Sequence, residues 1–177
     1  MWQEFYIDRY YKIPVAMTIS EYFYIDHNKN SIELPGKRTD PIQGVTIAAL
    51  PVLTYKHDAE QYIKRTLGGE TNGFAGHYII GVPGVYKTLP DDYAWQYETG
   101  RQNNKTICIS PIISDAFPIP DMYLVAPFQH AARLTAYVLK KNGLKTSDIN
   151  LTKGCPKYIL DRWKEFKTIV NNQFKRL

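Results

Sequence analysis

The side chains that could bind a metal ion or act as a nucleophile are few and lie far apart in the sequence. The cysteines are Cys108 and Cys155, and the histidines that fall on or beside predicted elements are His57, His77 and His130. The sequence has no Cys-x-x-Cys pair, no His-Glu-x-x-His helix, no Gly-x-Ser-x-Gly elbow and no glycine-rich phosphate loop. Any site must therefore be assembled from residues that the fold brings together.

Short apolar runs alternate with amphipathic segments, and these elements must position such a site. Strands are predicted at 45–50, at 106–110 and in the two runs that flank a Pro83-Gly84 hairpin turn. Apolar residues at helical spacing predict helices at 57–67, at 128–139 and from Asp161 onward. This alternation predicts an α/β or α+β protein.

The first part of the chain differs in composition from the rest. Residues 1–41 are rich in tyrosine and end in the turn-dense stretch 34–41. We therefore predict a Tyr-rich N-terminal arm over residues 1–41 and one main domain over residues 42–177.

The overall composition is that of a globular chain of 177 residues with a net charge of +5. No apolar run approaches the roughly 18 residues that a membrane span needs, so we expect no membrane partner. Acidic residues at 1–9 stand where a signal peptide has its basic region, so we expect a protein that is cytoplasmic as made. The basic residues are scattered along the sequence without interleaved aromatics, which gives no indication of nucleic-acid binding.

Five short motifs follow one another in a recognisable order. They are Gly76-His77-Tyr78-Ile79-Ile80-Gly81, Gly84-Val85-Tyr86-Lys87-Thr88-Leu89-Pro90, Ala94-Trp95, Asn103-Asn104-Lys105-Thr106-Ile107 and Lys153-Gly154-Cys155-Pro156. Together they resemble the zinc-dependent N-acetylmuramoyl-L-alanine amidases, a family that includes phage endolysins and peptidoglycan recognition proteins. The resemblance implies a mixed central β-sheet flanked by helices, with a groove over one sheet face for the glycan and stem peptide of peptidoglycan.

The resemblance also implies a zinc ion held by two histidines and an Asp or Cys, which activates a water molecule. In this sequence Ala48 occupies the first ligand position, the loop 148–153 carries no second histidine, and Cys155 retains the third position. Gln96 and Ser110 stand where the family has a histidine and often an acid. We therefore predict that the zinc site is lost, that these positions are relics of it, and that the protein has no cofactor.

The resemblance assigns a second set of residues to the groove. The candidates for ligand binding are His77, Tyr78, Trp95, Gln96 and Lys153. Lys153 lies two residues before Cys155, where phage members of the family have a lysine that stabilises charge at the scissile carbonyl. Core packing is the alternative for the aromatic residues and His77, and a solvated lysine is the alternative for Lys153.

The leading functional hypothesis is a pseudo-enzyme that binds peptidoglycan or muropeptides, or that serves a structural or regulatory role in a phage-related system. The first alternative is an active cell-wall amidase whose zinc ligands are rearranged, with His57 or His77 joining Cys155. The second alternative is a protein-interaction module whose partner binds residues 1–41. In each case we expect the chain to stay in the cytoplasm, to be phage-associated or to be released to the cell wall.

Overall fold

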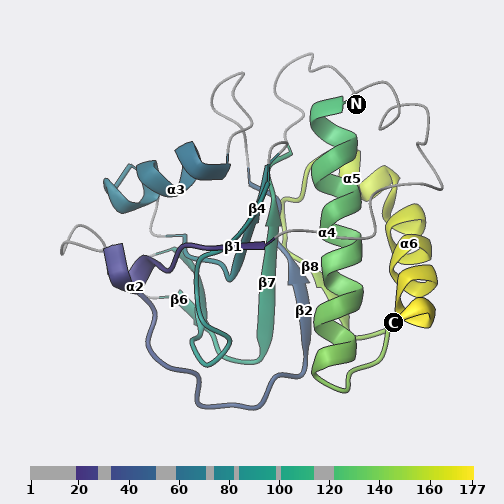
Figure 1. Ribbon diagram of the computed structural model, residues 1–177, viewed down its shortest axis with the longest axis horizontal. Helices are drawn as coiled ribbons and strands as arrows, with labels where there is room; N and C mark the ends of the chain where they lie inside the picture. Colours follow the sequence, from purple (N-terminus) through teal and green to yellow (C-terminus); the bar gives the residue numbers. More distant parts are fainter. Residues whose placement is uncertain are drawn as a thin grey trace.

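A mixed β-sheet forms the centre of the computed structural model, which describes residues 19–27, 33–50, 59–70, 74–81, 84–98, 101–113 and 122–177. Among these residues, six strands lie in the order β1-β4-β3-β7-β2-β8, and only the β3–β4 pair is antiparallel (Figure 1). The strands are β1 (Ile19–Glu21), β2 (Gly44–Ile47), β3 (Tyr78–Ile80), β4 (Val85–Lys87), β7 (Thr106–Pro111) and β8 (Ile149–Leu151). A separate antiparallel ribbon consists of β5 (Trp95–Glu98) and β6 (Arg101–Asn103).

The helices lie on both sides of this sheet (Figure 1). They are α2 (Tyr24–His27), α3 (Ala59–Leu67), α4 (Met122–Lys141), α5 (Lys157–Asp161) and α6 (Trp163–Arg176). Helix α4 packs on one face of the sheet with α6 outside it, whereas α3 packs on the other face. The predicted α/β class, a mixed central sheet flanked by helices, is confirmed. Across the described ranges, no helix is both long and apolar enough to cross a membrane.

Alternation along the strands divides the core into two layers. Val45 and Ile47 of β2, with Ile107 and Ile109 of β7, point to the side covered by α4, which we call the α4 face. The helices meet this face with apolar residues, among them Phe128, Ala132, Phe166 and Val170. Each fully buried side chain of this size contributes about 1.5–3 kcal/mol, so this layer supplies much of the stability of the fold.

The intervening residues of the same strands point to the opposite side, which we call the α3 face. Ala48, just after β2, and Cys108 of β7 pack there with Ile63 of α3 and Trp95 of β5. Thr46 and Ser110 are the polar residues at alternate positions of β2 and β7, and they too are buried. The α3 face therefore mixes polar and apolar groups, whereas the apolar layer on the α4 face is continuous.

The described residues of the predicted N-terminal arm pack onto the main domain. Strand β1 extends the sheet by pairing in parallel with β4. Tyr24 is completely buried in the α3-face cluster, and its backbone N–H donates to the carbonyl of Thr88 at 2.9 Å. Where it is described, this segment therefore shares the core of residues 42–177. The remainder, residues 1–18 and 28–32, lies outside the described residues.

Candidate functional site

Two positions of the expected zinc site meet at the carboxyl end of β2. The carbonyl oxygen of Ile47 accepts a hydrogen bond from the backbone N–H of Thr152 at 3.0 Å, and the Sγ atom of Cys155 lies 3.8 Å from the same oxygen. Ala48 is the next residue after Ile47, so Cys155 lies beside it. Cys155 also contributes to raising the pKa of Cys108 on the α3 face, although burial is the larger cause. Cys155 therefore lies at the carboxyl end of β2, next to the backbone of the residue that precedes Ala48.

A tight turn after β8 holds Cys155 in this position. Strand β8 pairs in parallel with β2, and the chain then turns through Lys153 and Gly154. Gly154 has a φ of 81°, a left-handed conformation that residues with a Cβ rarely adopt. Cys155 is buried, its thiol 3.5 Å from the hydroxyl of Thr152, whereas Lys153 is exposed. Lys153 is therefore the charged group that this turn presents to solvent beside Cys155.

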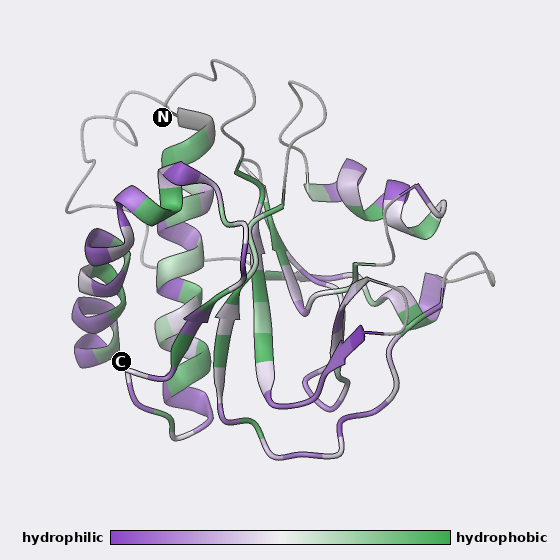
Figure 2. Ribbon diagram, turned by 180° about the vertical axis from the view of Figure 1, so that it is seen from behind, coloured by the Kyte–Doolittle hydropathy of each residue, from purple (hydrophilic) through white to green (hydrophobic). Residues whose placement is uncertain are grey.

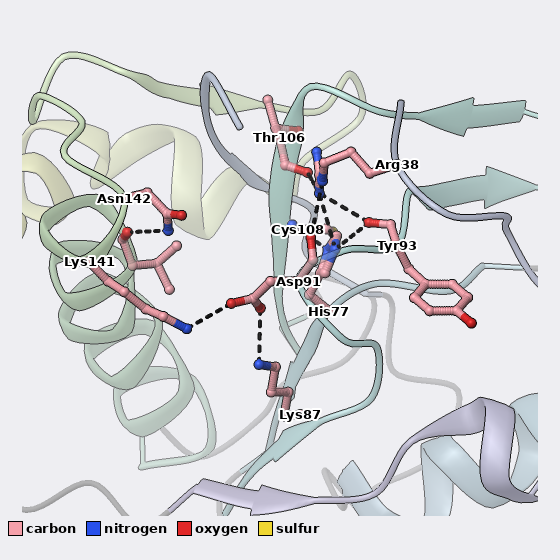
Figure 3. Close-up of polar contacts among 10 residues, drawn as sticks. Arg38, His77, Lys87, Asp91, Tyr93, Thr106, Cys108, Lys141 and Asn142 are labelled. Carbon is pink, nitrogen blue, oxygen red and sulfur yellow. Dashed lines mark hydrogen bonds and ion pairs between the residues drawn. The ribbon is translucent and has the colours of Figure 1, made fainter. Parts of the chain in front are cut away.

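His77 lies in the protein interior and uses both ring nitrogens (Figure 3). Its Nδ1 accepts a hydrogen bond from the backbone N–H of Cys108 at 3.0 Å, so Nε2 carries the proton and donates to the carbonyl of Tyr93 at 3.0 Å. Burial, with a further contribution from the guanidinium of Arg38, lowers the pKa of His77 to about 3. The imidazole is therefore neutral and bound to the backbone on both sides.

A close approach of the backbone fixes the strand at this point. A Cβ added to Gly76 would lie 3.0 Å from the Ser110 hydroxyl oxygen and 3.2 Å from the Cys108 sulfur. Glycine is thus favoured at position 76, because a Cβ there would force the side chains of Ser110 and Cys108 on β7 to move by a few tenths of an ångström.

Arg38 is an anchoring residue that the sequence analysis does not predict. Its guanidinium donates to four backbone carbonyls, those of Asp91, Tyr93, Asn104 and Thr106 (Figure 3). This half-buried cation joins the N-terminal segment to the loop before β5 and to the start of β7. No local pattern around Arg38 could have revealed this role, because all four acceptors lie more than fifty residues away in the sequence.

Asp91 links the sheet to the end of α4 (Figure 3). Its carboxylate lies 3.0 Å from the Lys87 ammonium and 2.8 Å from that of Lys141. Burial alone would raise the pKa of Asp91, but hydrogen bonds from Lys141 and Lys87 outweigh it, and the pKa falls below its ordinary value. This triad is a structural clamp, because the single carboxylate of Asp91 pairs with a lysine of β4 and with a lysine of α4.

The other predicted groove residues are buried. Trp95 is fully buried, and its Nε1–H donates to the hydroxyl of Thr106 at 3.0 Å. Gln96, also fully buried, donates from Nε2 to the carbonyl of Glu33 at 2.9 Å. Trp95 was a candidate for the groove, with core packing as the alternative. It lies in the core, because the β5–β6 ribbon folds over the α3 face and turns the indole inward.

Tyr78 and Ser110 complete the predicted set. Tyr78 packs in the α4-face cluster, on the side of the sheet opposite to Ala48, and burial raises the pKa of its phenol. Ser110 is fully buried, with its hydroxyl oxygen 3.3 Å from the sulfur of Cys108. The structure therefore brings together Ala48, Lys153 and Cys155, and it leaves Tyr78 on the other side.

The residues around Cys155 do not fit a protein zinc site, which needs three or four converging nitrogen, sulfur or carboxylate ligands. His77 has no lone pair left, and His130 lies on α4, which covers the opposite face of the sheet. The stretches that the structure describes hold no group of three or more His, Cys, Asp or Glu residues able to bind a metal ion. His57, the ligand suggested in one alternative, lies outside the described residues.

Comparison with known proteins rests on three-dimensional structure. No model of a protein family matches the chain, and no curated protein sequence matches it significantly. The crystal structure of the Staphylococcus aureus hydrolase AmiA in complex with its ligand superposes with a TM-score of 0.68 at 12% identity, covering 97% of this chain and 89% of that chain. The PlyG catalytic domain gives 0.67 at 16% identity, covering 89% and 96%.

A third similar structure is named as an enzyme. It is the N-acetylmuramoyl-L-alanine amidase LysC from Clostridium intestinale, with a TM-score of 0.50 and 14% identity over 88% of this chain and 99% of that chain. The chain has the amidase fold. The resemblance drawn from the sequence motifs is thereby confirmed at the level of the fold. Identities this low do not extend the likeness to activity, so the function of this amidase-fold chain depends on its own residues.

Proposed function

We propose that this chain is a pseudo-enzyme that binds peptidoglycan or muropeptides without zinc-dependent hydrolysis. The proposal is supported by Ala48, which by the resemblance occupies a ligand position and directly follows Ile47, the residue whose carbonyl oxygen lies 3.8 Å from the Cys155 thiol. A methyl group donates no lone pair, and one thiol with a neighbouring Thr152 hydroxyl does not make a zinc site.

The remaining residues also offer no replacement for metal-based chemistry. A water molecule that no metal activates keeps a pKa far above neutral pH and is a poor nucleophile there. Gln96, at the position of a family histidine, cannot exchange a proton and is fully buried. The neutral His77 is bonded on both nitrogens and cannot serve as a general base.

Lys153 is the group that we propose for recognition. Its exposed ammonium projects from the turn that holds Cys155, and the hydrogen bond from Thr152 to Ile47 fixes the base of that turn. A carboxylate of a stem peptide is its natural partner. An ion pair at an exposed site contributes only about 0.2–1 kcal/mol, so Lys153 would orient a ligand that other contacts also hold.

The proposal is tested by binding of the purified full chain to insoluble peptidoglycan and to soluble muropeptides. We expect wild-type protein to bind, Lys153→Ala to bind about two- to fivefold more weakly, and Lys145→Ala, which removes another exposed lysine, to bind like wild type. Mass spectrometry of the same mixtures should show intact lactyl amides.

Other outcomes would replace the proposal. Absence of binding to both ligands would favour a protein-interaction module or a structural role in a phage-related system. Cleavage of the lactyl amide that depends on Cys155 would favour an active amidase with rearranged ligands.

A further inference from the structure

The charges of this protein are divided unevenly along the chain. Residues 122–177 contain eleven Lys and Arg against three Asp and Glu, a net charge of +8. Residues 1–121 contain eleven Lys and Arg against fourteen Asp and Glu, a net charge of −3. Although the net charge of the whole chain is only +5, its C-terminal third, which forms α4, β8, α5 and α6, is strongly basic.

The fold gathers part of this charge on the outer side of α6. Lys164, Lys167, Lys175 and Arg176 are all exposed, whereas Phe166 and Val170 of the same helix are buried in the α4-face cluster. Figure 1 shows α6 as the outermost helix on this side, and Figure 2 shows hydrophilic colours along its outer surface. From residue 164 to residue 175 the helix rises about 16 Å, at about 1.5 Å per residue. We call this set of four cations the α6 basic face.

Among the described residues, no carboxylate forms an ion pair with the four cations, and Glu165, the acidic residue of α6, is partly buried. In the part of the chain that the structure describes, the ion pairs lie elsewhere, on α3, on the loop before β5 and at the end of α4. The positive charge of Arg176 also affects α4. Burial and, after it, the charge of Arg176 lower the pKa of Arg133 on that helix. Four exposed cations along one helix therefore create a positive potential that is not balanced locally.

The residues between these cations are polar and small. Thr168, Asn171 and Asn172 are exposed and can exchange hydrogen bonds with hydroxyl groups. Helices that lie in a membrane interface place Trp, Phe or Leu beside their cations, but the exposed large apolar residues of this region, Tyr137, Leu160 and Leu177, lie outside α6. The surface therefore fits a hydrated, hydroxyl-rich polyanion better than a lipid bilayer.

We infer that the α6 basic face is a docking surface for a linear polyol-phosphate polymer attached to the wall glycan. The inference rests on the proposed function, because such a polymer would hold the chain at the wall while the turn around Lys153 meets the stem peptide. The phosphates pair with the four cations, and the polyol hydroxyls face Thr168 and the two asparagines. Binding of this kind is electrostatic and weakens as salt is added.

The test compares two triple variants that lose the same charge. The first, Lys164→Gln with Lys167→Gln and Lys175→Gln, changes the α6 basic face. The control, Lys37→Gln with Lys64→Gln and Lys105→Gln, removes three exposed lysines from the remainder of the fold. Each is measured by sedimentation with sacculi that retain the polymer, with sacculi stripped of it, and with purified polymer over a range of salt concentrations.

We expect the first variant to bind purified polymer about tenfold more weakly at low salt, and its salt dependence to decrease by about two units of log–log slope. The control should stay within about twofold of wild type. Binding to stripped sacculi, which reports the proposed function alone, should be equal for all three proteins. Circular dichroism should show the same fold, since every substituted side chain is exposed.

Three results would overturn the inference. Equal weakening in both triple variants would show that only net charge matters. Unchanged binding of the first variant would show that the α6 basic face does not hold the polymer. Tighter binding to duplex DNA or to anionic vesicles than to the polymer, lost in the first variant, would assign the surface to a different macromolecule.

Discussion

The two faces of the central sheet are made by the same strands but have different chemistry. On the α4 face, β2 and β7 present Val45, Ile47, Ile107 and Ile109, all apolar. On the α3 face, the alternate positions present Thr46, Ala48, Cys108 and Ser110. The first face contributes stability through continuous apolar packing, whereas the second combines apolar side chains with buried polar groups.

The buried polar groups of the α3 face form hydrogen bonds within the protein. The hydroxyls of Thr46 and Thr106 lie 2.8 Å apart, and Thr106 also accepts a hydrogen bond from the indole of Trp95. His77 and Arg38 extend this bonding to the backbone. Thr46, Thr106 and His77 are buried, whereas Lys153, in the turn after β8, is exposed to solvent.

The largest effect should come from the α4 face. Replacing Phe166 with Ala removes a fully buried ring that packs against Phe128 and Trp163. We expect a loss of about 3–5 kcal/mol in the free energy of unfolding, measured by urea denaturation. Lys164→Ala on the exposed side of the same helix should change it by less than about 0.5 kcal/mol. Similar losses for both variants would contradict this packing.

The next effect should come from Arg38, at the border of the α3 face. Arg38→Met keeps the aliphatic stem but leaves four carbonyls without their donor. Because the group is half-buried and water can replace part of the bonding, we expect a loss of about 2–3 kcal/mol. Urea denaturation measures it, and a change below about 0.5 kcal/mol would show that Arg38 does not anchor the N-terminal segment.

A pH-dependent effect should come from His77. Its pKa is about 3 in the folded protein, against an ordinary value of 6.5, so between these two pH values the unfolded chain binds a proton that the folded chain does not. The stabilisation is complete above pH 6.5 and is lost as the pH falls toward 3, by about 2 kcal/mol between pH 6.5 and about 5.

Urea denaturation at several pH values measures this loss. His77→Gln removes the titrating group and should be less dependent on pH in that range. His27→Gln is the control, because it removes an exposed histidine and should leave the pH dependence of stability as in wild type. Equal pH dependence in wild type and His77→Gln would contradict a neutral, buried His77.

The smallest effect should come from Cys155. As a small buried thiol without a metal, it should contribute about 1 kcal/mol or less to stability, so Cys155→Ala should remain folded. Calorimetric titration with muropeptide should give the wild-type affinity within about twofold. A large loss of binding would indicate that Cys155 contacts the ligand or a metal.

The sequence predicts the elements that depend on local periodicity. The hairpin at Pro83-Gly84 corresponds to the antiparallel β3–β4 pair, and the three amphipathic segments correspond to α3, α4 and α6. Strands β1 and β8 and the β5–β6 ribbon were not predicted. They are three or four residues long and exist because of their pairing partners, which leaves no periodic pattern to detect.

The candidate site was predicted only in part, for a related reason. Motif positions indicated Ala48 and Cys155, and the Cys155 thiol lies 3.8 Å from the carbonyl oxygen of Ile47, the residue before Ala48. Burial of Trp95 and Gln96 could not be predicted, because it depends on how the β5–β6 ribbon folds over the sheet. The role of Arg38 was not predicted, because its carbonyl partners come from distant segments of the chain. The exposure of the α6 cations on one face could be seen only once the helix was placed outside α4.

The central claim is that this amidase-fold chain binds peptidoglycan without zinc hydrolysis. The most direct measurement is zinc content by elemental analysis of the purified chain, together with release of N-terminal alanine from purified cell walls, with and without added zinc or chelator. The account predicts no stoichiometric zinc and no release under any of these conditions. One equivalent of zinc, with release abolished by chelator and by Cys155→Ala, would contradict it.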